Sequence, residues 1–501
     1  MFNHQKIHYF KLLCLVLFVK AIAMTCLIIY GSIGLVPDEA QYWTWSKALD
    51  LGYYSKPPGI AWQIWLGTQL FGDTELGIRF MSIVFSFAQS VVIFFLCSKC
   101  RLKPGTCFWS ALLMAMAPMG FLGSFMAITD VGMLLFWSLA CLCVVSALAA
   151  LREPHPLLVG ALIMGGALFK WPMYLFWIFY LVCWRSYFPY QKMTAVLNGV
   201  LVSLIALLPS VWWNWTHDWA TFRHVFSTIQ GAQAKAGSNF FDFIGAQAAL
   251  LSPIIFAIFI ISMASWMKQR KIVTPPVFFC GLVTLSCLAL AISLSLFQKI
   301  QGNWAIFAYP TAFVVMGWKI NQWEKNKWLW IQGGIALSLS LIILILFVPF
   351  SPRLNPFKHH QGWNNLDKAL AGKGYDPNKN FLFSDKYQTT SILSFYGPGQ
   401  KQAYFVNLAG VRRNQFSYWP GIESEDKNKE GYFVWIENSP YLERDLKQKI
   451  DFYQTELNKY FGEVEYLGFE PLKEDDFSVV KGAIFFKCRN CQRLPEEINF
   501  W

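Results

Sequence analysis

Runs of about 20 mostly apolar residues recur along the chain from the N-terminus to Phe350, and they restrict its fold more than any other feature. A helix needs roughly 20 such residues to cross the hydrocarbon core of a bilayer. With 55% hydrophobic and only 14% charged residues, the 501-residue chain is too apolar for a soluble protein of this size. The pattern predicts an α-helical polytopic membrane protein with about 11 transmembrane helices. The predicted spans lie near residues 11–34, 77–97, 106–126, 131–150, 157–169, 171–184, 194–213, 241–266, 275–297, 304–318 and 328–350.

Short basic clusters at alternate ends of these spans predict the orientation of the chain. The clusters are Lys6 and Lys11; Lys99, Arg101 and Lys103; Arg152; Arg185 and Lys192; Lys268, Arg270 and Lys271; and Lys319, Lys325 and Lys327. By the positive-inside rule these loops are cytoplasmic, so Asp38, Glu39, Asp130, Lys170 and Lys299 face the opposite side. The formal charge of +12 is therefore a topology signal and does not indicate a nucleic-acid-binding surface.

The composition changes after Phe350, where the long apolar runs stop and charged residues become more frequent. We expect two domains: a transmembrane domain over 1–350, whose first external loop spans 36–76, and a soluble C-terminal α/β domain over 351–501. With an odd number of crossings, this tail lies on the same side as the external loops. Short β-rich strings occur at 381–383, 403–406, 432–436 and 483–486, and a polar helical stretch at about 441–461.

Two C-x-x-C pairs stand out among the 12 cysteines, Cys97 with Cys100 and Cys488 with Cys491. The predicted topology puts the pairs on opposite sides of the membrane, so they cannot form one four-cysteine zinc site. For Cys488 and Cys491 a local disulfide is the leading expectation, with free thiols as the alternative.

Asp38 and Glu39 form an adjacent pair of carboxylates just beyond the first apolar run. Two such groups at a membrane border are costly unless they face water, a cation or a reacting group. They mark a candidate site; taken alone, they would equally fit a solvated cap of an interfacial helix. A further carboxylate, Asp130, stands at the outer end of the third span, where capping the next helix is the alternative.

Several stretches in order along the external side carry a family resemblance. They are 36–43, 53–59, 70–80 and 127–131, with 383–388, 395–400 and 413–421 in the tail. Together they resemble the polyprenyl-phosphate-dependent glycosyltransferases of the C superfamily, which include bacterial family 39 proteins, protein O-mannosyltransferases and the lipid A aminoarabinose transferase. In that family an Asp-Glu pair opens the first external loop, a Tyr-x-x-Lys-Pro-Pro-like motif follows, and a second Asp begins the next loop. The chain departs from many relatives at Gln301-Gly302-Asn303-Trp304, where they have a histidine before the tryptophan.

The resemblance implies an inverting membrane glycosyltransferase of the bacterial inner membrane, with its catalytic loops and C-terminal domain in the periplasm. The enzyme would move a sugar from a polyprenyl-phosphate donor to a lipid A, glycan or protein acceptor, with membrane lipids as its surroundings and no nucleic acid as a partner. It implies no certain cofactor, although a divalent metal at Asp38 and Glu39 stays an option.

The chemistry assigns roles to the external residues. Asp38 is the expected general base for the acceptor hydroxyl, and Glu39 and Asp130 would position groups, hold a cation or tune the base. The expected donor-phosphate ligands are Lys56, Arg79, Lys170 and Lys299, and the other substrate contacts are Tyr42, Tyr54 and Asn303.

Each cationic residue has a structural alternative. Lys56 would otherwise be a snorkelling interfacial lysine, Arg79 a packing residue, and Lys170 a marker of a hairpin break. His217 and His224 are expected at the surface and not as metal ligands. The tail is expected to carry neither the base nor the phosphate site, but to cover the cavity or select the acceptor.

The competing class of function is a transporter or flippase of polyprenyl-linked sugars or lipids, for which charges near broken helices are also expected. In an enzyme, Asp38, Lys56 and Asp130 should converge in one cavity open to the outer side and to lipid. In a transporter, the charged groups should line a path accessible from both sides.

Overall fold

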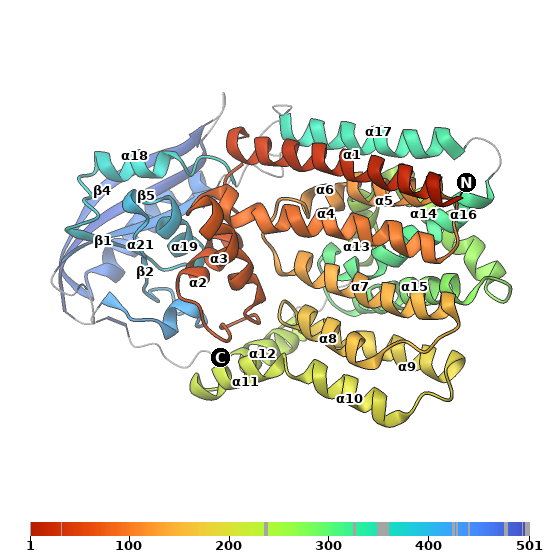
Figure 1. Ribbon diagram of the computed structural model, residues 1–501. Coiled ribbons are helices and arrows are strands. Elements are labelled where there is room, and N and C mark those ends of the chain that lie inside the picture. Colours follow the sequence, from red (N-terminus) through yellow and green to blue (C-terminus); the bar gives the residue numbers. More distant parts are fainter. Residues whose placement is uncertain are drawn as a thin grey trace.

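The computed structural model describes residues 2–31, 33–234, 239–323, 327–347, 360–422, 426, 429–438, 441–474, 479–492 and 494–495. Its N-terminal part is a bundle of helices, and its C-terminal part is a sheet with helices, set against one end of the bundle (Figure 1). The helices of the first part are α1 (Phe2–Tyr30), α2 (Pro37–Lys47), α3 (Gly59–Phe71), α4 (Glu75–Lys99), α5 (Pro104–Met116), α6 (Pro118–Leu122), α7 (Thr129–Ala150), α8 (Pro156–Ala167), η1 (Trp171–Leu175), α9 (Phe176–Tyr187), α10 (Met193–Leu204), α11 (Leu207–Thr216), α12 (Ala220–Ala234), α13 (Phe240–Leu251), α14 (Pro253–Gln269), α15 (Pro275–Phe297), η2 (Gly302–Ala308), α16 (Tyr309–Gln322) and α17 (Lys327–Phe347).

Several helices of the bundle are apolar enough to cross a membrane. Within the described residues, α1 from His4 onward, α4, α7 and α15 have the required length and composition, and the count rises to six if each of two bent pairs is one span. The bend is 44° between α10 and α11 and 107° between α13 and α14. The predicted spans at 77–97, 131–150 and 275–297 coincide with α4, α7 and α15. The total of eleven crossings stays a prediction.

The predicted first external loop is largely helical. Helices α2 and α3 lie between the bundle and the C-terminal part (Figure 1). All of α2 from Glu39 to Ser46 is buried, although this stretch is mostly polar and aromatic. Its burial follows from contact with both parts of the chain, because helix α19 (Tyr387–Tyr396) packs on α2 from the other side.

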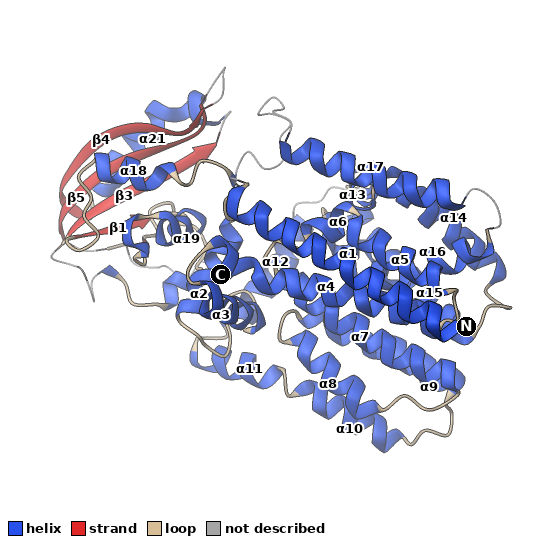
Figure 2. Ribbon diagram, turned by 45° about the horizontal axis from the view of Figure 1, so that its top comes forward, coloured by secondary structure: helices blue, strands red, loops and turns tan. Residues whose placement is uncertain are grey.

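The C-terminal part is a mixed five-stranded sheet with helices on both faces (Figure 2). The strand order is β2-β1-β3-β5-β4; β1 is parallel to β2 and β3, and β5 is antiparallel to β3 and β4. The remaining elements are α18 (Asn365–Gly372), β1 (Asn380–Ser384), η4 (Pro398–Gln400), β2 (Tyr404–Phe405), η5 (Gln415–Tyr418), β3 (Glu430–Asn438), α21 (Tyr441–Leu457), β4 (Phe461–Glu474) and β5 (Val479–Cys491).

Strand alternation divides the sheet between two cores. Side chains such as Phe433 and Phe486 pack against α21 on one face. On the other face, Val434 and Phe485 join a core that continues through α18 and α19 into α2 and α3. The sheet therefore contacts the predicted catalytic loop through a shared hydrophobic core.

Most of the predicted tail elements correspond to observed ones. The strings at 381–383, 403–406, 432–436 and 483–486 fall in β1, β2, β3 and β5, and the helical stretch corresponds to α21. Strand β4 was not predicted, because its sequence is interrupted by charged residues and by Pro471, and its side chains are mostly half-buried or exposed.

The expected Cys488–Cys491 disulfide is wrong for this structure, in which both residues are buried near the end of β5 and form no disulfide. Asn490, which lies between them, has a positive φ of 55°, and both cysteine side chains face the same core. The thiols instead contribute to the core against α21.

Helices α8 and α10 approach closely at paired glycines. A Cβ atom added to Gly160 would lie 2.1 Å from the carbonyl oxygen of Gly199. By contrast, a Cβ added to Gly245 in α13 would meet nothing within 4 Å.

We expect Gly160→Ala to lower the melting temperature of the purified protein, because the methyl group forces α8 away from α10. Overpacking of this kind typically costs about 1–3 kcal/mol. The control Gly245→Ala should leave the melting temperature unchanged or raise it, since alanine favours helix over glycine. Equal melting temperatures for Gly160→Ala and the wild type would contradict this packing.

Candidate functional site

Glu39 and Arg79 form a buried ion pair at the centre of the site, with exposed side-chain fractions of 0% and 1%. Arg79 donates from Nε to Glu39 Oε1 over 3.0 Å and from Nη2 to Glu39 Oε2 over 2.7 Å. Glu39 also accepts from the backbone N–H groups of Ala127 and Val36, over 2.8 Å and 3.0 Å. The carboxylate therefore ties α2 and α4 to the segment that leads into α7.

The electrostatics of Glu39 follow from these contacts. Burial raises the pKa of Glu39, but the charge and hydrogen bonds of Arg79 and the two backbone N–H groups outweigh it, so that its pKa lies below the usual value. Such contacts fit a side chain that positions neighbouring residues, which is one of the three roles expected for Glu39. Arg79 also donates to the carbonyl oxygens of Ile33 and Gly34. These contacts fit the structural alternative for Arg79, a packing residue, better than the expected role of a donor-phosphate ligand.

A polar cavity of about 450 Å³ lies between α2, the 54–56 loop, α12 and the tail. Four predicted site residues line it together: Asp38, Tyr42, Tyr54 and Lys56. The structure thus brings the expected base and the expected phosphate lysine to one cavity, as the enzyme hypothesis requires.

The charges in this cavity act on one another. Burial raises the pKa of Asp38; Lys56 opposes this shift and the neighbouring Glu39 adds to it. Burial and the charge of Lys170 lower the pKa of Lys56, whereas Asp130 and Asp38 raise it, with a net decrease. A carboxylate with a raised pKa accepts a proton more readily, which is the property that a general base needs.

Asp130, Lys170 and Asn303 form a second group of predicted residues. Lys170 Nζ lies 2.7 Å from Asp130 Oδ1, and Asn303 Nδ2 donates to Asp130 Oδ2 over 3.3 Å. Asp130 does not line the polar cavity, but it is close enough to Asp38 for both charges to act on Tyr42, whose pKa burial and these carboxylates raise well above its usual value. The residues of the polar cavity and this second group therefore lie close together.

An apolar cavity of about 180 Å³ adjoins the second group. Asn303 of η2 lines it, together with residues of α4 to α7 and their connections, α13 and α16. Its lining residues are Ser86, Gln89, Ser90, Met114, Ala115, Met119, Gly120, Leu122, Gly123, Met126, Ile128, Val131, Leu134, Leu250, Asn303, Ile306 and Tyr309. Asn303 thus lines this mostly apolar space and also bonds to Asp130 of the second group.

Sequence reasoning missed several residues of the polar cavity. His224 lines it, although a surface position was expected, and Arg412 Nη1 lies 3.3 Å from His224 Nδ1. Burial, Arg412 and Lys56 lower the pKa of His224 to about 4, so the ring is neutral near pH 7. The other missed residues are Gln41, Ser55, Gln301, Asp385, Lys386, Tyr387, Gln388, Phe405, Val411, Arg412, Arg413 and Asn414.

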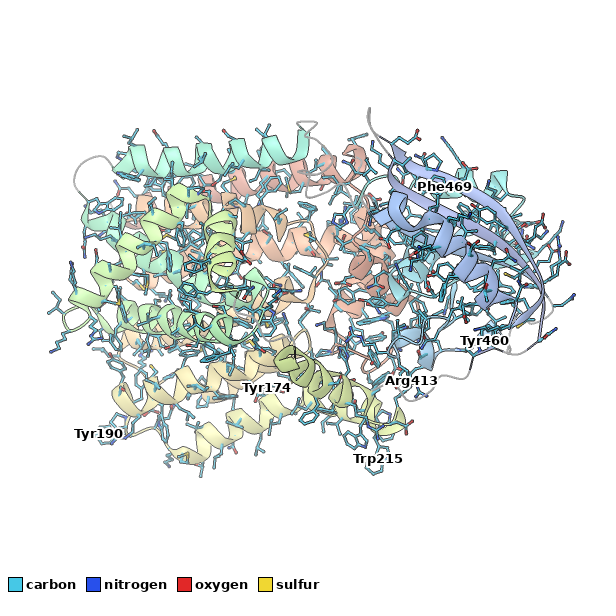
Figure 3. All side chains as sticks on the ribbon, turned by 180° about the vertical axis from the view of Figure 1, so that it is seen from behind. Tyr174, Tyr190, Trp215, Arg413, Tyr460 and Phe469 are labelled. Carbon is cyan, nitrogen blue, oxygen red and sulfur yellow. The ribbon has the colours of Figure 1, made fainter. Side chains whose placement is uncertain are left out.

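Some of these missed residues could have been predicted from the sequence. The stretches 383–388 and 413–421 carry the family resemblance, and residues 385–388 and 413–414 line the cavity. Figure 3 shows Arg413 at the side of the tail that faces α11 and α12, in agreement with the cavity lining. No motif or neighbouring residue in the sequence indicated that His224 lines the cavity.

Lys299 is not brought to either cavity, and its side chain is exposed. The optional metal at Asp38 and Glu39 does not fit the donor set, since Glu39 is already bonded to Arg79 and to two N–H groups, and Asp38 faces Lys56. Among the described residues, no three His, Cys, Asp or Glu side chains form a group that could hold a metal.

Part of the chain is similar to a known protein family. Residues 55–213 match the family described as dolichyl-phosphate-mannose-protein mannosyltransferase, and they include Lys56, Arg79, Asp130 and Lys170. The match covers about a third of the chain and is a similarity of this segment to that family. The matched segment contains most of the predicted cationic site residues, while Asp38 lies just before it.

A curated relative matches a longer part of the chain. Over 314 residues, or 61% of its length, the chain is 31% identical to lipid A galacturonosyltransferase RgtD of Rhizobium johnstonii. It spans about 63% of the length of that curated relative.

Solved structures show the same fold. The TM-score is 0.62 to ArnT from Cupriavidus metallidurans bound to undecaprenyl phosphate and 0.59 to its apo state, each at 14% identity over 94% of this chain and 97% of that chain. The predicted resemblance to the C superfamily is confirmed.

We expect Glu39→Gln to lower the thermal stability and the membrane accumulation of the protein strongly. Removing one partner leaves the Arg79 charge buried and unpaired, which typically costs about 3–5 kcal/mol. The control Glu456→Gln removes the surface pair between Lys459 and Glu456 and should change the melting temperature little. The reading of Glu39 as the anchor of the site fails if both variants melt like the wild type.

Proposed function

We propose that the chain is an inverting glycosyltransferase that moves a sugar from a polyprenyl-phosphate donor to a lipid A-like acceptor at the periplasmic face of the bacterial inner membrane. The observation that carries the proposal is the meeting of Asp38 and Lys56 in one polar cavity. The similarity to a lipid A galacturonosyltransferase and to the fold of ArnT supports it.

The donor has an apolar prenyl chain and an anionic phosphate. The apolar cavity suits the prenyl chain, and the polar cavity suits the phosphate. The apolar cavity lined by residues of α4 to α7 would receive part of the prenyl chain. Lys56 would meet the phosphate, with Lys170 adding positive charge beside Asp130. A preorganised cation facing the charge that develops on the leaving phosphate typically contributes about 3 kcal/mol to transition-state stabilisation.

The acceptor would enter from the side of the tail. Lys56, Lys386, Arg412 and Arg413 outnumber the two acidic residues that line the polar cavity, Asp38 and Asp385. This excess of positive charge favours an anionic glycolipid. Arg412 and Lys386 would hold its charged groups while one hydroxyl reaches Asp38.

The reaction then balances as a single displacement. Asp38 takes the proton of the acceptor hydroxyl, and the oxygen attacks the anomeric carbon. The bond between that carbon and the phosphate oxygen breaks, and the polyprenyl phosphate leaves with the electron pair, facing Lys56. One displacement at the anomeric carbon inverts its configuration.

A transporter is the alternative class, and the placement of the site favours an enzyme. Most of the predicted site residues lie in α2, in the loop before α3, or near the starts of α4, α7 and η2. Figure 1 shows α2 and α3 at the end of the bundle that meets the tail. A transport path would need such groups near the middle of the spans.

We expect Asp38→Asn to abolish transfer while the protein still accumulates. The isosteric amide keeps the packing but cannot accept the proton, and loss of a general base typically costs about 10²–10⁴-fold in rate. The measurement is mass spectrometry of lipid A, surface glycans and exported proteins from cells that lack the chain, carry the wild type, or carry Asp38→Asn or the control Asp451→Asn. Asp451→Asn, at an exposed position of α21, should transfer normally. If no product depends on the wild-type chain, the function is wrong; if Asp38→Asn makes the product normally, the role of Asp38 is wrong.

We expect Lys56→Met to weaken binding of undecaprenyl phosphate to the purified protein by about 10-fold or more, because one charge-assisted contact of this kind is worth roughly 1.5–3 kcal/mol. Lys47→Met is the matched control, since Lys47 pairs with Asp73 at the surface and does not line the cavity. Equal affinities for the two variants would contradict the phosphate role of Lys56.

A further inference from the structure

The segment that leads to Asp38 is held in place without regular secondary structure. Residues 33–36 connect α1 to α2, and side chains from other elements bind the backbone of each of them. Arg79 of α4 holds the carbonyl groups of Ile33 and Gly34, and Glu39 accepts from the N–H group of Val36. Asp38 follows two residues later, so its place depends on how this segment is fixed.

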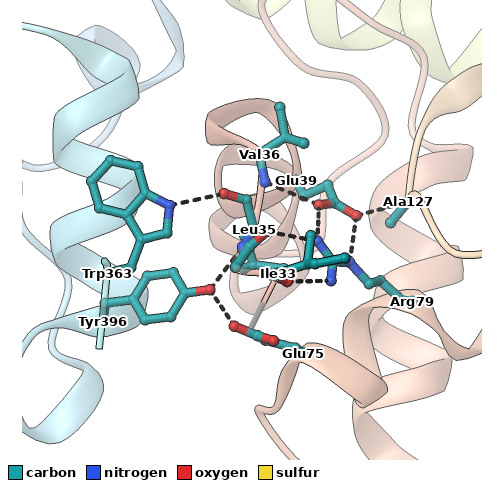
Figure 4. A network of polar contacts seen from close by, with 10 residues as sticks. Ile33, Leu35, Val36, Glu39, Glu75, Arg79, Ala127, Trp363 and Tyr396 are labelled. Atoms are coloured by element: carbon teal, nitrogen blue, oxygen red, sulfur yellow. Dashed lines mark hydrogen bonds and ion pairs between the residues drawn. The ribbon is translucent and has the colours of Figure 1, made fainter. Parts of the chain in front are cut away.

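The tail supplies the contacts to the remaining residue, Leu35 (Figure 4). The N–H group of Leu35 donates to the hydroxyl oxygen of Tyr396 over 2.7 Å, and its carbonyl oxygen accepts from Nε1 of Trp363 over 3.2 Å. The Tyr396 hydroxyl in turn donates to the Glu75 carboxylate at the start of α4. The peptide groups of Leu35 are thereby tied to the tail on both sides.

Trp363 is itself firmly seated. Lys481 Nζ lies 3.1 Å from the centroid of its indole ring and also donates to the carbonyl oxygen of Gln361 over 2.8 Å. The ring packs directly on the chain at Gly34, where an added Cβ would lie 2.5 Å from Trp363 Cδ1. The indole therefore has little room to move relative to the sheet.

Helix α19 connects this contact with the polar cavity. Its first two residues, Tyr387 and Gln388, line the cavity, and its last residue is Tyr396. Between them, Phe395 meets Trp43 of α2 edge-to-face, with ring centroids 5.0 Å apart. One short helix of the tail thus borders the cavity, packs on the helix that carries Asp38, and binds the segment before it.

We propose that Tyr396 and Trp363 are positioning residues that fix Asp38 in the cavity, so that the tail is needed for the chemical step although it supplies neither the base nor the phosphate lysine. This inference rests on the proposed function for its effect on transfer. Its structural part, the hold on residues 33–38, stands independently of the substrate.

The test uses the full-length protein with Tyr396→Phe and Trp363→Phe, each of which removes one hydrogen bond to Leu35 and keeps an aromatic ring. Tyr432→Phe is the control, because Tyr432 is also buried in the tail but its hydroxyl donates to the carbonyl oxygen of Lys373 within the tail. Three quantities are measured: hydrogen exchange of the peptide covering 33–42, binding of undecaprenyl phosphate, and the transfer rate in the assay used for Asp38→Asn.

We expect both variants to speed exchange over 33–42 by about 5-fold or more, since a lost hydrogen bond eases local opening. The transfer rate at saturating donor should fall by about 10-fold or more, because small displacements of a catalytic group are costly. The affinity for undecaprenyl phosphate should stay within about 2-fold of the wild type, a split that general destabilisation would not give. The control should match the wild type in all three.

Two results would overturn the inference: exchange over 33–42 that is unchanged in both variants, or faster exchange with an unchanged transfer rate. If one variant fails to accumulate, the other decides, since both bind the same peptide groups. If the wild-type chain modifies no lipid A, glycan or protein, the proposed function fails, and the exchange measurement alone decides whether the tail holds residues 33–38.

Discussion

The buried pair of Glu39 and Arg79 is the interaction on which the rest of the site depends. An ion pair taken out of water stabilises a fold only when its geometry is good and its remaining hydrogen-bonding groups are satisfied. Here the contact is bidentate, and two backbone N–H groups and two carbonyl oxygens complete it. The pair joins residues 33–36, α2, α4 and the segment before α7. It therefore fixes, from one point, the elements that carry Asp38 and Asp130.

Near the Glu39–Arg79 pair, the chain forms one polar cavity and one apolar cavity. The polar cavity contains Asp38 and Lys56 and an excess of basic residues, and the apolar cavity inside the bundle begins at Asn303, which is bonded to Asp130. Desolvation disfavours the charged forms of Asp38 and Lys56, and the charge of each residue partly stabilises the charge of the other. Such a site suits an amphiphilic substrate with a charged head.

The tail is part of this site and not a separate attachment. It shares a hydrophobic core with α2 and α3, lines the cavity from Asp385 to Asn414, and binds Leu35 beside the expected base. The sequence suggested that the tail covers the cavity or selects the acceptor, and its basic lining residues are consistent with either role. Its hold on residues 33–36 adds a mechanical role that its composition did not indicate.

The sequence by itself predicted the helical membrane architecture, the resemblance to a glycosyltransferase family and the pairing of Asp38 with Lys56, because apolar length and short motifs are local signals. The helices α4, α7 and α15 and four of the five strands could be located in this way. Local signals could not show that α2 is a buried helix, because its polar and aromatic sequence fits an exposed interfacial loop equally well. Nor could they show that Arg79 pairs with Glu39, that His224 faces Lys56, or that Leu35 bonds to Tyr396 across 361 positions. Only the tertiary structure decided those contacts, because a polar side chain finds its partner through the packing of distant elements, and that packing has no periodic trace in the sequence.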